Sequence, residues 1–316
     1  TISDDANVTI NDSANQTNLI ETENSSENAN EQEIVENDKE NDKENDNSNN
    51  DISSEDEEIL VQSADEEIAV TSLTTRDFTV DGPSNGFSYD NSNGVLTISS
   101  AGTYTISSRT GTSSIHKRIV VTASAEVILN GMNINPADGA ALEVQGNSAT
   151  NTSDNVTATI KLKGTNKLTT TNINCAGLQL SNGANVILEN GAAESETVGS
   201  LTATGGSITL GINGGSGIGT GFKGTAGDIT INGGTVTATG GFYGVSIGSG
   251  TEGTVGDITI SGGTVTATGG DHGAGIGSYA SGTAGNITIS GGMVTATGIG
   301  LGSLGTVGDI TISGGT

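Results

Sequence analysis

A near-identical repeat in the C-terminal third of the chain constrains its fold more than any other feature. The segment GDITISGGTVTATGG at 256–270 has a close copy, GDITINGGTVTATGG, at 227–241, and the equivalent residues Val236, Val265 and Val294 are 29 residues apart. A fixed period of this size indicates a solenoid, in which each repeat packs only against its neighbours.

The alternation of side chains within one repeat predicts strands. Ile258 and Ile260 alternate with polar residues, and after a Gly-Gly pair Val265 and Ala267 alternate with threonines. A period of two places alternate residues on opposite faces of a strand. With a third short segment around Ile276, each repeat predicts three strands joined at glycine corners. The predicted fold is therefore all-β, a single-stranded parallel β-helix.

One short repeat locates the loops of this solenoid. The repeat 285–307 aligns with its neighbours only if six residues equivalent to 270–275 are absent. Residues that can be absent must form a loop, so we predict six-residue loops at 241–246 and 270–275 on one corner. Stacking of the coils then places equivalent residues in ladders, with isoleucine and valine inside and threonine outside.

The chain divides into three parts by composition and period. Residues 201–316 hold regular repeats of 23–35 residues and end within a repeat, whereas 76–200 alternate apolar and polar residues without a clean period. We predict that 76–200 form irregular first coils with a cap, because a solenoid must cover the open end of its core. The residues expected to cover that end are the aromatics Phe78, Phe87, Tyr89 and Tyr104.

The first 75 residues have a different composition. They contain no glycine and no aromatic residue, and their 22 Asp and Glu face only Lys39 and Lys43. Few apolar groups and strong self-repulsion do not offset the entropy cost of ordering a chain. We predict a disordered acidic spacer at 1–75.

Composition also narrows the possible partners. From residue 76 onward the net charge is −7, and Lys223 is the only basic residue after Lys167. Nucleic-acid binding is disfavoured because it requires clustered Lys and Arg. The single cysteine, Cys175, rules out an intrachain disulfide framework, and no stretch is long and apolar enough to span a membrane.

The runs LTISSAGTYTISS, KRIVVTASAEVILNGMNI and ATIKLKGTNKLTTT, followed by the Gly/Thr repeats, resemble the clostridial carbohydrate-binding parallel β-helix family. This family has a pectate-lyase-like fold, and similar Gly/Thr-rich repeats occur in cell-surface proteins of Firmicutes. The resemblance covers about residues 76–316. It implies a right-handed, secreted or cell-surface β-helix, expected to be monomeric, that binds pectin- or cellulose-type polysaccharide with calcium in the fold.

The loops carry the candidate sugar-binding residues. Phe242 and Tyr243 align with Asp271 and His272 of the next repeat, so we expect these four side chains to be neighbours. Aromatic residues in Gly-, Ser- and Thr-rich loops have little core to cover them, and sugar sites combine rings with polar groups. Two further aromatics, Phe222 and Tyr279, are predicted at the next corner. The alternative is that the rings fold back over their own loops.

Calcium is the predicted cofactor, with Asp228, Asp257 and Asp271 as candidate ligands. Calcium prefers oxygen ligands, and stacked turns place Asp228 beside Asp257. Solvated turn aspartates are the alternative. We predict no enzymatic activity. Pectate elimination needs an Arg or Lys base on the surface, and the repeats contain no Arg and one Lys, at a turn. Glycoside hydrolysis needs two carboxylates at a defined separation, whereas the aspartates of the repeats occupy strand starts.

Two other functions stay open. The outward threonines form a T-x-T array of the kind used by ice-binding solenoids, although threonine is also an ordinary choice for a solvated strand. A purely structural adhesin shaft or stalk of a larger surface protein is the remaining alternative.

Overall fold

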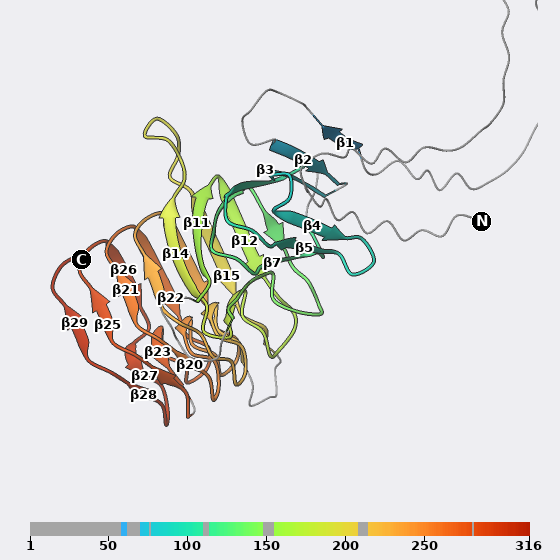
Figure 1. The fold of residues 1–316 in the computed structure, drawn as a ribbon. Helices are drawn as coiled ribbons and strands as arrows, with labels where there is room; N and C mark the ends of the chain where they lie inside the picture. Colours follow the sequence, from blue (N-terminus) through green and yellow to red (C-terminus); the bar gives the residue numbers. More distant parts are fainter. Residues whose placement is uncertain are drawn as a thin grey trace, which may run out of the picture.

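The chain folds into a parallel β-helix. The computed structural model describes residues 58–61, 70–75, 77–109, 114–147, 155–207, 214–279 and 281–316, and every regular element within them is a strand. The coils stack from the N-terminal to the C-terminal end (Figure 1). The predicted all-β solenoid is confirmed. Most of the predicted acidic spacer, residues 1–57 and 62–69, lies outside the described residues.

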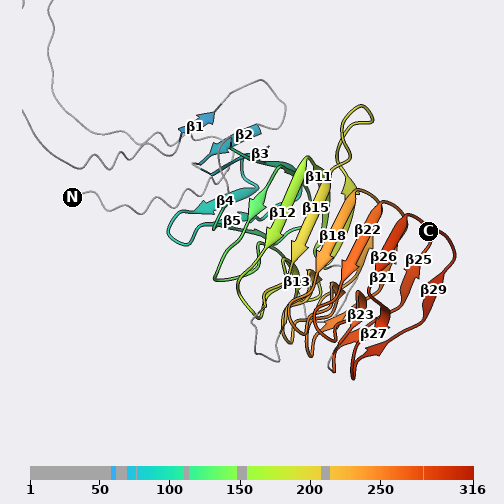
Figure 2. The same ribbon diagram turned by 180° about the vertical axis from the view of Figure 1, so that it is seen from behind.

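Four sheets, which we call S1 to S4, form the walls of the β-helix (Figures 1 and 2). In spatial order, S1 contains β1 (Glu58–Val61), β2 (Val70–Thr74), β3 (Phe78–Pro83), β6 (Thr103–Ser108), β8 (Ala125–Asn130), β11 (Thr157–Lys163), β14 (Asn185–Asn190), β17 (Ile229–Ile231), β21 (Ile258–Ile260), β25 (Ile287–Ile289) and β29 (Ile310–Ile312). S2 contains β27 (Ile299–Leu301), β23 (Ile276–Ser278), β19 (Ile247–Gly248), β16 (Ile218–Gly219), β13 (Leu178–Ser181), β10 (Leu142–Gln145), β7 (Arg118–Val121), β5 (Val95–Ile98) and β4 (Phe87–Asp90). S3 contains β26 (Met293–Ala296), β22 (Thr264–Thr268), β18 (Thr235–Thr239), β15 (Ser200–Thr204), β12 (Thr165–Thr169) and β9 (Asn133–Ile134).

S4 was not predicted. It contains β20 (Thr254–Val255), β24 (Thr283–Ala284) and β28 (Thr306–Val307), which form a fourth short strand in each of the last three coils. Each of these strands has an exposed threonine followed by a buried or half-buried apolar residue. Two residues are too few to show a period, so the alternation was invisible in the sequence.

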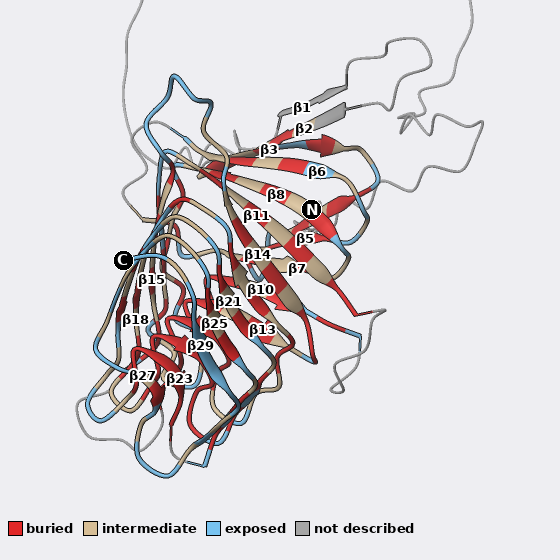
Figure 3. Ribbon diagram, turned by 90° about the vertical axis from the view of Figure 1, so that its left-hand side faces the viewer, coloured by how far each residue is buried: buried red, intermediate tan, exposed pale blue. Residues whose placement is uncertain are grey.

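The predicted ladders are confirmed by the strand register. In S1, Ile229 pairs with Ile258, and Ile258 pairs with Ile287. These isoleucines are fully buried and form the apolar core with the valines of S3. Figure 3 shows the alternation of buried and half-buried residues along β8, β11 and β14. In the last described coil the same positions are open, and Ile312 is 62% exposed.

An antiparallel cap closes the N-terminal end of the core. The pairs β1–β2, β2–β3, β3–β6 and β4–β5 are antiparallel, and parallel stacking begins with β6–β8 and β5–β7. The capping aromatics are buried as edge-to-face pairs, with ring centroids 5.4 Å apart for Phe78 and Tyr89 and 6.3 Å apart for Phe87 and Tyr104. Because β1 and β2 extend this sheet, the strands begin within the segment assigned to the acidic spacer.

The corner between S3 and S2 holds the predicted loops. Residues 269–275 separate β22 from β23, whereas only residues 297–298 separate β26 from β27. Ile276 nevertheless pairs with Ile299, so the shorter coil keeps the register of its neighbour. The corner between S1 and S3 is a Gly-Gly pair whose second residue has a positive φ, as at Gly263 with 83°, a conformation that glycine adopts without strain.

A ladder of Asp and Asn side chains links successive coils along the edge of S1. The backbone N–H of Asp257 donates to Asp228 Oδ1 at 2.8 Å, and the N–H of Asn286 donates to Asp257 Oδ1 at 2.7 Å. The ladder continues in both directions, because the Asp228 N–H donates to Asn185 Oδ1 and the Asp309 N–H donates to Asn286 Oδ1. Each accepting side chain therefore satisfies the backbone N–H of the residue just before the next strand of S1. Either an acid or an amide can fill this role.

This ladder predicts opposite effects for two substitutions of Asp257. Asp257→Asn keeps the acceptor and removes one of two adjacent negative charges, so the melting temperature should equal or exceed that of the wild type. Asp257→Ala leaves the Asn286 N–H to water, which should lower the free energy of unfolding by about 1 kcal/mol. Denaturant unfolding followed by circular dichroism checks both, and equal losses would contradict the ladder's role.

Candidate functional site

The two loops at the S3–S2 corner share one turn hydrogen bond, although the backbone φ of His272 is positive, at 65°, and that of Tyr243 is not. In each, the N–H of the last glycine donates to the carbonyl of the first, at 2.8 Å for Gly244 to Gly241 and 2.9 Å for Gly273 to Gly270. The loops also stack, because the Gly270 N–H donates to the Gly244 carbonyl at 2.9 Å. The two residues between the glycines therefore come into register along the axis, as the sequence predicted.

Four rings gather at this corner. Tyr243 is nearly parallel to His272, with ring centroids 5.9 Å apart, and to Tyr279, with centroids 5.7 Å apart. Phe242 meets Tyr243 edge to face at 4.6 Å. We call Phe242, Tyr243, His272 and Tyr279 the aromatic corner. Phe242 and Tyr243 are half-buried and His272 is exposed, so three of the four rings keep surface that a ligand can reach.

Tyr279 has a different role from the other three rings. Its side chain is only 9% exposed and packs with Tyr243, Val245 and Ala274. Burial raises the pKa of its hydroxyl, with smaller contributions from Tyr243 and the charge of Asp271. The predicted ligand-binding residue Tyr279 is thus a support beneath Tyr243 rather than an open binding face.

The position of Tyr279 departs from the repeat. The S2 register aligns it with Gly221, Gly250 and Gly302 of the other coils. A Cβ atom at Gly302 would lie 2.6 Å from Tyr279 Cδ2, so the ring rests against the backbone of the following coil.

Phe222 lies elsewhere on the structure. It occupies the turn 221–224, two coils before Tyr279 on the S2–S4 corner, where the Lys223 ammonium is 4.9 Å from its ring centroid. The Lys223 ammonium also lies 3.4 Å from the carboxylate of Glu252 in the next coil. The sequence predicts Phe222 and Tyr279 at one corner; the register places them at the same corner two coils apart, and of the two only Tyr279 stacks on Tyr243.

The aspartates predicted to bind calcium do not form a common site. Asp228 and Asp257 each use an Oδ1 atom to accept a backbone N–H, whereas Asp271 is exposed on its loop. Among the described residues, no group of three or more His, Cys, Asp or Glu side chains is arranged to hold a metal ion. Calcium also takes backbone carbonyl and water oxygens, so binding by these residues stays a prediction.

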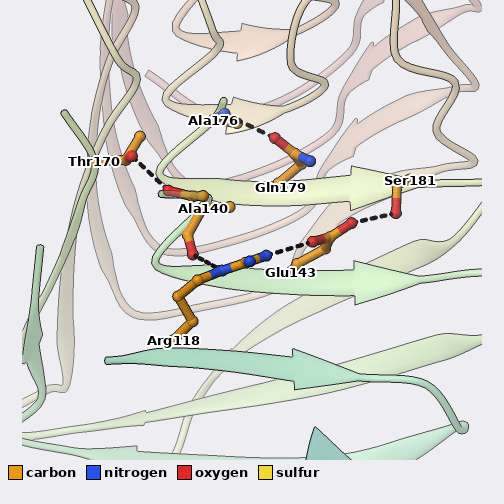
Figure 4. Close-up of polar contacts among 8 residues, drawn as sticks. Arg118, Ala140, Glu143, Thr170, Ala176, Gln179 and Ser181 are labelled. Carbon is orange, nitrogen blue, oxygen red and sulfur yellow. Dashed lines mark hydrogen bonds and ion pairs between the residues drawn. The ribbon is translucent and has the colours of Figure 1, made fainter. Parts of the chain in front are cut away.

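S2 carries a polar network that the sequence did not predict (Figure 4). The Arg118 Nη2 atom donates to Glu143 Oε2 at 2.9 Å, and the Ser181 hydroxyl donates to Glu143 Oε1 at 2.7 Å. The Arg118 Nε atom also donates to the Ala140 carbonyl at 3.3 Å. Both carboxylate oxygens are therefore engaged, which suits a network that holds three early coils together. No repeat aligns these residues, so their contact could not be read from spacing.

Comparisons with known proteins agree with the fold. A family model described as a β-helix repeat matches residues 229–251, 258–282 and 287–306. No curated protein and no solved structure gave a significant match to the chain. In the described residues there is no helix of sufficient length and apolarity to cross a membrane. The matched repeats cover the coils that carry the aromatic corner, and they support a parallel β-helix repeat protein.

The support role of Tyr279 predicts a local effect of its removal. Tyr279→Gly restores the residue that the neighbouring coils carry, so the turn should be retained while the Tyr243 ring loses its packing partner. We expect faster amide hydrogen exchange in residues 241–244 and 270–273, with β21 and β25 unchanged. Tyr279→Phe keeps the stack and should exchange as the wild type does. Unchanged loop exchange in Tyr279→Gly would contradict the role.

Proposed function

We propose that this chain is a non-catalytic β-helix that binds polysaccharide at the aromatic corner. One observation carries the proposal: accessible rings of Phe242, Tyr243 and His272 gather on two stacked loops, over a small buried cluster of Val245, Ala274 and Tyr279. The other residues of the two loops are mostly small, with five glycines, an alanine, a valine and a serine in addition to Asp271. Rings that remain accessible in such a surface indicate a binding function.

The chemistry of the corner suits a sugar. The apolar face of a sugar ring packs on an aromatic ring, and its hydroxyls require nearby donors and acceptors. Here Asp271 and His272 supply polar groups beside Tyr243, and the loop carbonyls supply more acceptors. The buried ring of Tyr279 fixes Tyr243 from below, which reduces the entropy cost of binding on it.

The absence of catalysis is part of the proposal. Glycoside hydrolysis uses two carboxyl groups of distinct roles. The adjacent pair Asp228 and Asp257 accepts backbone N–H groups from the following strands, which supports a scaffold role for both. The proposed location is outside the cell or on its surface, and the proposed partner is a plant cell-wall or host polysaccharide bound by a monomer.

Binding at the aromatic corner predicts that removal of its accessible rings weakens affinity. The variant Phe242→Ala/Tyr243→Ala should raise the dissociation constant for the best glycan on an array by about tenfold or more, since aromatic anchors dominate binding energies. Thr259→Ala on the outer face of S1 is the control and should bind normally. Melting curves of both variants should stay close to the wild type.

Two results of this experiment would contradict the proposal. Intact binding by the double variant would place the site elsewhere. No binding of the wild type to any glycan would favour the adhesin shaft, in which the coils act only as a spacer.

A second candidate function, ice binding, rests on the outer face of S3. The register places Thr202, Thr237, Thr266 and Thr295 in one row, with a second row through Thr204, Thr239 and Thr268. The rows repeat at about 4.8 Å between coils and about 6.7 Å along each strand. Such an uncharged, regular hydroxyl lattice supports ice binding. A third row runs through Ser200, Thr235 and Thr264 but ends at Met293.

Thermal hysteresis separates this candidate from the first. If S3 binds ice, the wild type should depress the freezing point below the melting point, and Thr266→Leu at the centre of the lattice should reduce that gap. Thr259→Leu on S1 is the matched control. No hysteresis in the wild type would exclude the candidate, and nanolitre osmometry measures it directly.

A further inference from the structure

We propose that the aromatic corner selects uncharged polysaccharides and rejects those built from uronic acids. This inference rests on the proposed function and narrows its ligand class. Pectin-type and cellulose-type chains offer similar ring faces, but only the first carries a carboxylate on each uronic acid residue. The charges around the corner decide between them.

The charged groups beside the rings are unsuited to a carboxylate ligand. Asp271 lies next to His272 on the same loop, and its charge contributes to the raised pKa of Tyr279, so its electrostatic effect reaches the supporting ring. Uronate carboxylates that pack on Tyr243 would therefore meet a like charge. Near a protein surface such repulsion over a few ångströms is not cancelled by the solvent.

The coils that form the aromatic corner, residues 229–307, contain no lysine or arginine to compensate for this charge. After Lys167 the sequence contains one basic side chain, Lys223. Its ammonium is 3.4 Å from the Glu252 carboxylate and lies over the Phe222 ring, two coils before Tyr279. Recognition of a carboxylate normally relies on Arg or Lys that can form charge-assisted hydrogen bonds. This part of the chain holds its single cation in an ion pair instead.

A bridging cation does not rescue the acidic ligand. Calcium could link a uronate to protein carboxylates, but the described residues contain no group of three or more His, Cys, Asp or Glu side chains arranged for a metal ion. The two stacked aspartates, Asp228 and Asp257, are committed to backbone N–H groups on the edge of S1. The corner is left with rings, an imidazole, the Asp271 carboxylate and neutral loop groups, which match hydroxyls rather than carboxylates.

The test compares two soluble ligands of equal length, a β-1,4-linked glucose hexasaccharide and a galacturonate hexasaccharide. Titration calorimetry is run at slightly alkaline pH, where imidazoles are uncharged, at low and high sodium chloride, with calcium or with chelator. We expect the neutral ligand to bind with little salt dependence and the galacturonate to bind at least about tenfold more weakly. Chelator should change neither result.

Two variants of Asp271 sharpen the comparison. Asp271→Asn removes the negative charge with little change of size, and Asp271→Lys places a cation beside the rings. We expect galacturonate affinity to rise from wild type to Asp271→Asn and again to Asp271→Lys, with the last gain lost at high salt. A comparison of the wild type with the Tyr243→Ala variant shows whether each ligand binds at the rings.

The outcomes distinguish this inference from the function on which it rests. Galacturonate that binds the wild type as tightly as the neutral ligand, and loses affinity in Tyr243→Ala, would overturn the selectivity and keep the polysaccharide site. Failure of both ligands, together with failure of every other glycan, would overturn the proposed function itself.

Discussion

The parallel register between coils is the interaction on which the rest of this structure depends. Each coil donates and accepts hydrogen bonds along the axis, so equivalent residues lie above one another at about the 4.8 Å sheet spacing. A residue type that suits one rung therefore suits the next. Ile258 is buried between Ile229 and Ile287 for this reason. For the same reason Asp257 accepts the backbone N–H of Asn286, as Asp228 accepts that of Asp257.

Because the register repeats, a residue that breaks a ladder is more informative than one that continues it. Tyr279 stands in a row of glycines, and Tyr243 and His272 stand in two stacked loops that the following coil lacks. Nothing in the stacking of the backbone requires these rings. The rings stabilise one another by packing, and the surface that they keep accessible is available to a ligand.

The repeats made the fold readable from sequence, and their absence limited what could be read elsewhere. The S1 and S3 ladders and the corner loops followed from a spacing of 29 residues that the register confirms. The antiparallel cap did not follow, because antiparallel pairing such as β3–β6 joins segments with no common pattern. The contact between Arg118 and Glu143 was hidden for the same reason. At the site, alignment paired Tyr243 with His272, but the reach of Tyr279 depends on side-chain direction.

The aromatic corner is a property of three successive coils rather than of one loop. The first supplies Tyr243, the second supplies His272 and Tyr279, and the third supplies Gly302, where even a Cβ atom would displace the supporting ring. Transfer of either loop alone to another solenoid would separate Tyr243 from its support.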